Sequence, residues 1–330
     1  MPNVAIHCKA SVADGMGHIY RQINIAKELK KRGYEISFYV PEFTPAINLL
    51  TQSQFTPRLI NQESSITKYL DKFFDFIILD MQDTTESLVA SIKQFARQVI
   101  SFEDLGTGRN YVDLLIDCNL ASSESKNIFS NTKVLFGPVY SVLHPNFSHY
   151  HKQPRNFSTS IKSLLIIMGA TDPQELTLPL TKLFLKENNI IKLTVLRGHN
   201  TTNRSKLNEL SAQFKSLSIL EPIPNIAQTL WEHDAVVCAG GITLHEAIAV
   251  GTPAFVINQA KHQQTQALFI EKSGAAINLG IGREYDIEKL KKAISLKKPE
   301  LESMSLKGKN LIDGQGISRV TEAMINLTKS

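Results

Sequence analysis

Short apolar runs rich in β-branched residues alternate with amphipathic stretches along the whole chain. The runs predict strands at 4–8, 35–40, 76–80, 98–102, 113–118, 133–137, 164–169, 191–197, 217–220, 235–239, 254–257 and 275–280. Between the first two runs, apolar positions recur with helical spacing from Ile19 to Leu29, and Gly33 marks the end of the predicted helix. Alternation of strands and helices at this spacing predicts parallel sheets covered by helices.

The strand candidates fall into two series separated by the polar stretch 149–162. We therefore predict two Rossmann-like, doubly wound α/β domains at 1–150 and 151–330, with a hinge near residue 150. Residues from about Glu302 onward predict a helix pair without a strand, which can pack on either half.

Composition adds limits on function. The 330 residues are 42% hydrophobic and 20% charged, and the net charge of +5 is scattered. We therefore predict no nucleic-acid partner, and this charge would serve an anionic small substrate equally well. We find no apolar run of about 20 residues and no signal-peptide pattern at the N-terminus, so we predict a cytoplasmic protein without a membrane span. The spacing of Cys8, Cys118 and Cys238 predicts buried free thiols rather than a disulfide framework or metal site. We expect a monomer without cofactor.

Ligands of open parallel sheets bind beyond the carboxyl ends of the strands, so the loops at those ends carry the functional signal. In the loop 10–21, Gly15 and Gly17 allow a tight turn, and His18 opens a helix, where backbone N–H groups favour an anion. The dinucleotide fingerprint is incomplete because Tyr20 stands where a third glycine is needed. The histidine is placed for proton transfer, and the alternative is a tight turn with an incidental histidine.

Two further loops stand out in the second half. The loop 169–177 opens with Gly169 and contains Asp172-Pro173, a turn or helix start. In 234–257, a buried strand runs into Gly240-Gly241 and then a helix. Glycines followed by a hydroxyl residue at a helix start suit a diphosphate, and the alternative is a plain turn. Glu246, one turn further, suits ribose hydroxyls.

The pattern G-G-x-T-L-x-E-A, helix, G-T-P and strand resembles the nucleotide-binding half of GT-B glycosyltransferases. Nearly end to end, the chain resembles the UDP-sugar hydrolase family of pseudaminic acid biosynthesis. The segments that carry this resemblance are 10–21, 102–117, 137–147, 168–177 and 313–319.

The resemblance implies a GT-B fold, with two Rossmann-like domains facing across a cleft and UDP on the C-terminal half. It implies hydrolysis of a UDP-activated diacetamido sugar for nonulosonic acid synthesis, with His18 as general base and no metal. The implied nucleotide-binding residues are Gly169, Gly240, Gly241, Thr243, Leu244 and Glu246. The implied substrate-binding residues are Gly15, Gly17, Tyr140, Asp172, His262 and Gln263.

The chain departs from that family at the substrate end. Lys9 replaces an aspartate, which predicts that His18 lacks an acidic partner unless Asp14 supplies one. His262 replaces an asparagine expected to contact sugar or water. His144 and Asn146 replace an arginine and an acidic residue.

Other polar residues have two interpretations. Asp80, Asp83, Glu103 and Asp104 either reach the mouth of the cleft or cap helices. Among the histidines, His149 and His151 are predicted in the linker, His199 and His233 on exposed turns, and His245 in helix packing.

Three functions are compatible with these patterns. The first is the hydrolase, with water as acceptor. The second is a glycosyltransferase that uses the same donor with another acceptor. The third is a nucleotide-sugar binder that has lost catalysis, motivated by Lys9.

Overall fold

The computed structural model describes residues 1–11, 15–61, 65–119, 132–186, 192–198, 201–223 and 225–327. The chain divides into two compact units. Unit 1 consists of Met1–Leu143 and Gln315–Ser330, and unit 2 is the continuous stretch His144–Gly314.

Unit 1 is built on a parallel sheet with strand order β3-β2-β1-β4-β5-β6-β7. Its strands are β1 (Asn3–Cys8), β2 (Glu35–Pro41), β3 (Pro57–Ile60), β4 (Phe74–Asp80), β5 (Ala96–Phe102), β6 (Leu114–Asp117) and β7 (Lys133–Phe136). Its α-helices are α1 (Gly17–Lys31), α2 (Thr44–Gln52), α3 (Glu86–Ile92) and α13 (Gly316–Leu327). The register of β1 with β4 places Cys8 opposite Asp80, so both strands end at the same level of the sheet.

Unit 2 repeats the plan with strand order β10-β9-β8-β11-β12-β13, again parallel. Its strands are β8 (Ser163–Ile167), β9 (Lys192–Leu196), β10 (Leu217–Leu220), β11 (Ala235–Cys238), β12 (Ala254–Asn258) and β13 (Ala276–Ile281). Its α-helices are α5 (Pro145–Lys152), α6 (Thr177–Phe184), α7 (Arg204–Gln213), α8 (Ala227–Trp231), α9 (Ile242–Ala249), α10 (Lys261–Lys272), α11 (Ile287–Ile294) and α12 (Lys298–Leu311).

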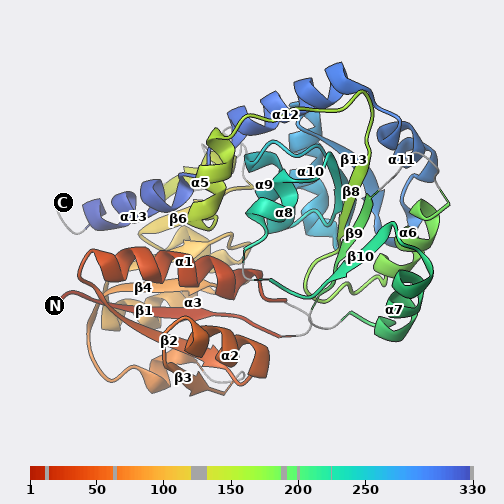
Figure 1. The fold of residues 1–330 in the computed structure, drawn as a ribbon. Helices are drawn as coiled ribbons and strands as arrows, with labels where there is room; N and C mark the ends of the chain where they lie inside the picture. Colours follow the sequence, from red (N-terminus) through yellow and green to blue (C-terminus); the bar gives the residue numbers. More distant parts are fainter. Residues whose placement is uncertain are drawn as a thin grey trace. The chain divides into compact units, whose positions relative to one another are not determined.

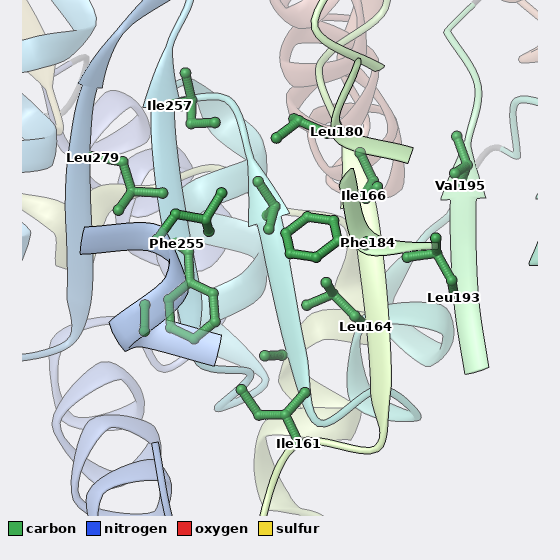
Figure 2. Close-up of a cluster of buried hydrophobic side chains, with 14 of the residues drawn as sticks. Ile161, Leu164, Ile166, Leu180, Phe184, Leu193, Val195, Phe255, Ile257 and Leu279 are labelled. Atoms are coloured by element: carbon green, nitrogen blue, oxygen red, sulfur yellow. The ribbon is translucent and has the colours of Figure 1, made fainter. Parts of the chain in front are cut away.

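Burial of apolar side chains between sheet and helices holds unit 2 together. Figure 2 shows Leu164 and Ile166 of β8, Phe255 of β12 and Phe184 of α6 in one cluster, and all four are at most 1% exposed. Complete burial of side chains of this size stabilises a fold by about 1.5–3 kcal/mol each before entropic costs. The apolar runs that predicted β8 and β12 therefore supply part of this core, and helix residues such as Phe184 supply the rest.

The predicted strands are all present, but β3 was missed. Among the described residues, this edge strand pairs only with β2, and it leaves Arg58 and Leu59 exposed. A strand covered on so little of its surface needs no continuous apolar run, so its sequence carried no strand signal.

The predicted domain boundary needs two corrections. The first concerns α13, which packs on α1 and on the 3-10 turn η4 (Pro138–Tyr140) and so belongs to unit 1 (Figure 1). Gly316 allows this approach, because a Cβ there would overlap the carbonyl of Ser141. The Arg319 guanidinium donates to the Val139 carbonyl at 3.1 Å. Residues of the segments 137–147 and 313–319, which carry part of the resemblance, thus pack α13 against the rest of unit 1.

The second correction concerns the polar stretch 149–162, which is not a linker. It lies within unit 2, where α5 packs on α8 and α9. Its polar side chains satisfy backbone carbonyls of that unit: the His151 ring contacts Ala249 O at 2.9 Å, and Arg155 donates to Trp231 O and His233 O at 2.7 and 2.6 Å. Polarity here reflects buried hydrogen bonding.

Candidate functional site

In unit 1, the turn between β1 and α1 presents His18 at the second position of the helix. Gly15 has a φ of +75° and donates its N–H to Ser11 O at 3.0 Å, which closes the turn. Gly17 begins α1, and a Cβ on it would meet no protein atom within 4 Å. The structure therefore explains Gly15 through its backbone conformation, whereas no contact among the described residues requires a glycine at position 17. Asp14 lies outside the described residues.

The prediction that His18 lacks an acidic partner is wrong, because Asp80 at the end of β4 takes that position. The His18 Nδ1 lies 2.7 Å from Asp80 Oδ1, and both side chains are buried. We assign Nδ1 as the donor to the carboxylate, which leaves Nε2 of the neutral ring as a proton acceptor. The partner was missed because it lies 62 residues away in sequence, on a neighbouring strand.

Arg21, one turn along α1, binds the same carboxylate side-on. Its Nε donates to Asp80 Oδ2 at 2.8 Å and its Nη2 to Asp80 Oδ1 at 2.7 Å. Gln22 Nε2 adds a bond of 2.7 Å to Oδ2. Burial alone would raise the pKa of Asp80, but the charges of Arg21 and His18 and their hydrogen bonds outweigh it and hold that pKa well below its ordinary value. Asp80 is therefore an anion fixed in orientation.

Lys9, the residue that replaces the family's aspartate, takes no part in this pairing. Its ammonium forms an ion pair with Asp83, whose carboxylate is largely exposed. Of the four acidic residues with two interpretations, Asp80 thus reaches the base, whereas Asp83 pairs at the surface. Asp104 is fully buried and binds the N–H groups of Thr84 and Gly106 at 3.0 and 2.9 Å. Its role is to staple two loops.

In unit 2, the loop after β11 turns at Gly240-Gly241 and starts α9 at Ile242. A Cβ on Gly240 would overlap the side chain of Asn258, the last residue of β12. Thr243 is buried, and Leu244 has a fully buried side chain and donates its N–H to Gly241 O at 3.1 Å. Leu244 therefore supports the turn through packing.

A glutamine that the motifs did not reveal joins the three loops at this edge of the sheet. Gln259 donates from Nε2 to Met168 O and to Asp172 Oδ1, both at 3.3 Å, and its backbone N–H donates to Gln263 Oε1 at 2.8 Å. Its Oε1 accepts from Gln174 N at 3.2 Å. The predicted residues Asp172, Gln263, Gly240 and Gly241 are thus brought together, because Gln263 also lies against both glycines. An uncharged amide outside any motif gives no sequence signal.

Asp172 acts as a helix cap in the structure. Its φ of +43° turns the chain so that its two carboxylate oxygens accept from Leu176 N and Thr177 N at 3.0 and 2.9 Å. Gly169 opens the same loop with a φ of +85°, and the turn at Gly198 presses against its carbonyl. The carboxylate of Asp172 is therefore engaged at the start of α6.

Glu246 lies in the second turn of α9 and is partly buried. Desolvation raises its pKa to about 8, so the carboxyl group is largely protonated at neutral pH. A protonated carboxyl can both donate and accept hydrogen bonds. His245 beside it is buried and contacts the side-chain amide of Gln266, in agreement with its predicted packing role.

The structure also places the remaining predicted residues. Tyr140 is on η4 in unit 1, beside the start of α13. His262 is exposed at the start of α10. His144 caps α5 by accepting from Asn146 N at 3.2 Å. His149 is exposed, and His233 is buried instead of exposed, with ring nitrogens 2.6 Å from Thr229 O and 2.7 Å from Thr194 Oγ1. His199 lies outside the described residues.

The described parts of the chain hold neither a candidate metal site nor a candidate membrane-spanning helix. No set of three or more His, Cys, Asp or Glu residues there is arranged to hold a metal ion. None of the helices there has the length and apolar character needed to cross a membrane. The three cysteines are free and buried, as predicted.

Comparison with known proteins agrees with this architecture. Residues 165–315 match the family model of the glycosyltransferase family 28 C-terminal domain. The chain is 27% identical to the spore coat polysaccharide biosynthesis protein SpsG of Bacillus subtilis (strain 168), over 98% of each chain. The solved structure of Acinetobacter baumannii MurG matches with a TM-score of 0.70 and 13% identity, over 99% of this chain and 100% of that one.

A second solved structure, UDP-GlcNAc 2-epimerase from Neisseria meningitidis bound to UDP-GlcNAc, matches with a TM-score of 0.65 and 13% identity. This match covers 98% of the present chain and all of the epimerase. The chain therefore has the GT-B glycosyltransferase-like fold, with two parallel-sheet α/β units, as predicted.

Proposed function

We propose that this chain is an enzyme that cleaves the bond between a sugar's anomeric carbon and UDP, with His18 as the general base. The observation that carries the proposal is the His18–Asp80 pair, which fixes the ring through Nδ1 and leaves Nε2 to accept a proton. The arrangement corresponds to a base with an orienting carboxylate. Base catalysis of this kind contributes about 10²–10⁴-fold to a rate.

Unit 2 is proposed to hold the nucleotide. The diphosphate would lie at the Gly240-Gly241 turn, where the start of α9 offers N–H groups and the positive end of the helix dipole. Glu246 would bind the ribose hydroxyls. The match of residues 165–315 to a glycosyltransferase domain supports this assignment, as does the fold shared with an epimerase bound to UDP-GlcNAc.

The comparisons favour a glycosyltransferase, because the matching family model is a glycosyltransferase domain. Transfer of the sugar to a hydroxyl acceptor deprotonated by His18 is therefore the function we put first. The hydrolase, with water in place of that acceptor, is the second candidate, for the resemblance that implied it runs along most of the chain. One objection to catalysis is gone, since Asp80 supplies the partner that the replacement at Lys9 was expected to remove.

The test measures UDP release from a panel of UDP-activated amino sugars, with and without a mixture of hydroxyl acceptors. His18→Ala is compared with His149→Ala, which changes an exposed histidine on α5. Release that needs an acceptor and is lost only in His18→Ala supports the transferase, and release in buffer alone supports the hydrolase. UDP binding without turnover under every condition would refute both.

A further inference from the structure

We propose that Glu103 is a positioning residue that supplies the second negative charge needed to balance His18 when the ring carries its proton. The proposal rests on the proposed role of His18 as base. Glu103 follows β5 and binds the guanidinium nitrogen that Asp80 leaves available: Arg21 Nη1 lies 2.7 Å from Glu103 Oε2. The four side chains form the continuous series His18, Asp80, Arg21, Glu103, which we call the charge chain.

The charges of these four side chains cancel only when the His18 ring is protonated. With a neutral ring, two carboxylates and one guanidinium leave a net charge of −1 in a largely buried site. When His18 accepts a proton, the net charge becomes zero. Buried charge is costly unless it is compensated, so the second carboxylate favours the state that the base reaches during the reaction. Without Glu103, Arg21 would cancel Asp80 and leave the protonated ring uncompensated.

The backbone holds Glu103 in an uncommon conformation to make this contact. Its φ of +47° lies in the left-handed region, where a non-glycine residue is under strain. Glu103 N donates to Ile116 O at 2.8 Å, which ties the residue to β6. The next residue, Asp104, staples the loop to Thr84 and Gly106. Contacts on both sides of the strained residue therefore fix its side chain on Arg21.

The glycines of the same loop make this staple possible. A Cβ on Gly106 would overlap backbone atoms of Thr84, and one on Gly108 would overlap the Thr84 side chain. The segment 102–117, which carried part of the resemblance, is thus shaped to press two loops together. Because the two loops pack this closely at the edge of the sheet, the orientation of Glu103 is fixed.

The other titratable groups around the charge chain are two thiols, one ion pair and one further carboxylate, Asp117. From β1, Cys8 is buried, and burial raises the pKa of its thiol well above the ordinary value. After β6, Cys118 donates to Glu103 Oε1 at 2.6 Å, and burial together with that carboxylate likewise raises its pKa. Both thiols are therefore neutral. Lys9 and Asp83 compensate each other, and Asp117 at the end of β6 accepts from Asn119 N at 2.9 Å.

Glu103 itself is an anion. Burial would raise its pKa, but the guanidinium of Arg21 outweighs that effect and lowers the pKa below the ordinary value. Cys118, as a neutral donor to Oε1, fixes the second oxygen. Each carboxylate oxygen of Glu103 thus accepts from a neighbouring side chain, which fixes the orientation of the group.

The test uses Glu103→Gln, which keeps the shape and an oxygen for Arg21 but removes the charge. We expect kcat for UDP release to fall about tenfold with KM within about twofold, and the acid limb of the pH–rate profile to move down by about one pH unit. Glu103→Asp should recover part of the rate. Glu35→Gln is the matched control, because Glu35 is an exposed carboxylate at the start of β2, paired with Lys72. A pH profile that stays in place in Glu103→Gln would overturn the proposal.

A second readout separates this proposal from the proposed function. The NMR signals of the His18 ring are followed against pH in the ligand-free protein, in the wild type, Glu103→Gln and Glu35→Gln. We expect the midpoint to move to lower pH in Glu103→Gln alone. This result would support the charge chain even if no UDP-sugar is turned over, and equal midpoints would refute it even if the enzyme is active.

Discussion

Apart from β7, the two sheets have the same order of strands, but the residues at the C-terminal ends of those strands differ in chemistry. In unit 1, the residues at this edge are ionic: a base, two carboxylates and a guanidinium in contact. In unit 2, the amide of Gln259 joins the corresponding loops, and the carboxylate of Asp172 is engaged in capping α6. The contrast is consistent with the proposed division of roles, in which unit 1 supplies the base and unit 2 holds the nucleotide.

The largest effect is expected from Asp80→Asn, which breaks the ionic side of the comparison. An amide cannot compensate Arg21 or hold the His18 ring in its reactive tautomer, so kcat should fall by about 10²–10⁴-fold. Loss of the anion should also cost about 3 kcal/mol of unfolding free energy, because a buried guanidinium loses one partner. Steady-state kinetics and urea unfolding measure the two effects. A rate like that of the wild type would show that His18 needs no carboxylate.

The next largest effect is expected in unit 2, at the turn formed by Gly240 and Gly241. Gly240→Ala places a Cβ into Asn258 and should lower the unfolding free energy by about 1–3 kcal/mol. Gly241→Ala is the matched control, because its Cβ would lie 3.5 Å from Gln263 Nε2, an ordinary contact. Urea unfolding of the two variants compares them. Equal losses in both would argue against the packing of Gly240 on Asn258.

The two units should also respond to pH with opposite signs. The pKa of Asp80 is lowered on folding, so its stabilisation is present above the pKa of an unfolded aspartate, about 4, and is lost as the pH falls through that range and below. The pKa of Glu246 is raised to about 8, so its contribution is complete below about pH 4.5 and is lost as the pH rises toward 8.

Glu246→Gln isolates the second of these effects. The variant has no carboxylate to bury, so at pH 9 it should be more stable than the wild type by about 1 kcal/mol, with the partial exposure of the group taken into account. Thermal unfolding at pH 6 and pH 9 measures the difference. An advantage that is the same at both pH values would contradict the assignment to ionisation.

The smallest effect is expected from Lys9→Met. The pair with Asp83 is solvent-exposed on the aspartate side, so its loss should change stability by less than about 1 kcal/mol and kcat by less than about twofold. Kinetics alongside Asp80→Asn make the comparison direct. A large loss of kcat would return Lys9 to the catalytic group.

Sequence patterns were sufficient for the parts of the fold that follow from burial. Buried strands are continuous apolar runs, and α1 shows its helical spacing, so these elements could be predicted. Strand β3 and the partner of α13 could not, because an edge strand needs little apolar surface and an amphipathic helix does not specify which unit it covers. The loops of the candidate site were located for the same reason, since they follow predicted strands.

The interactions within the site were harder to predict than its location. Asp80 and Glu103 were recognised as acidic residues near strand ends. Their contact with Arg21 on α1 depends on how β1, β4 and β5 pair, which the sequence pattern does not specify. Gln259 and Asn258 lack charge and motif, and their roles arise from which loops meet. His233 was predicted to be exposed because its neighbours in sequence are charged. In the structure its ring is buried and forms hydrogen bonds with Thr229 O and Thr194 Oγ1.

The return of α13 to unit 1 has a consequence for how the chain is made. Unit 2 is one uninterrupted stretch, whereas unit 1 needs residues from both sides of it. During synthesis, the sheet of unit 1 emerges first but waits for the helix that covers α1 until residues 316–327 have left the ribosome. Unit 2, although later in the sequence, can therefore complete its structure before unit 1 does.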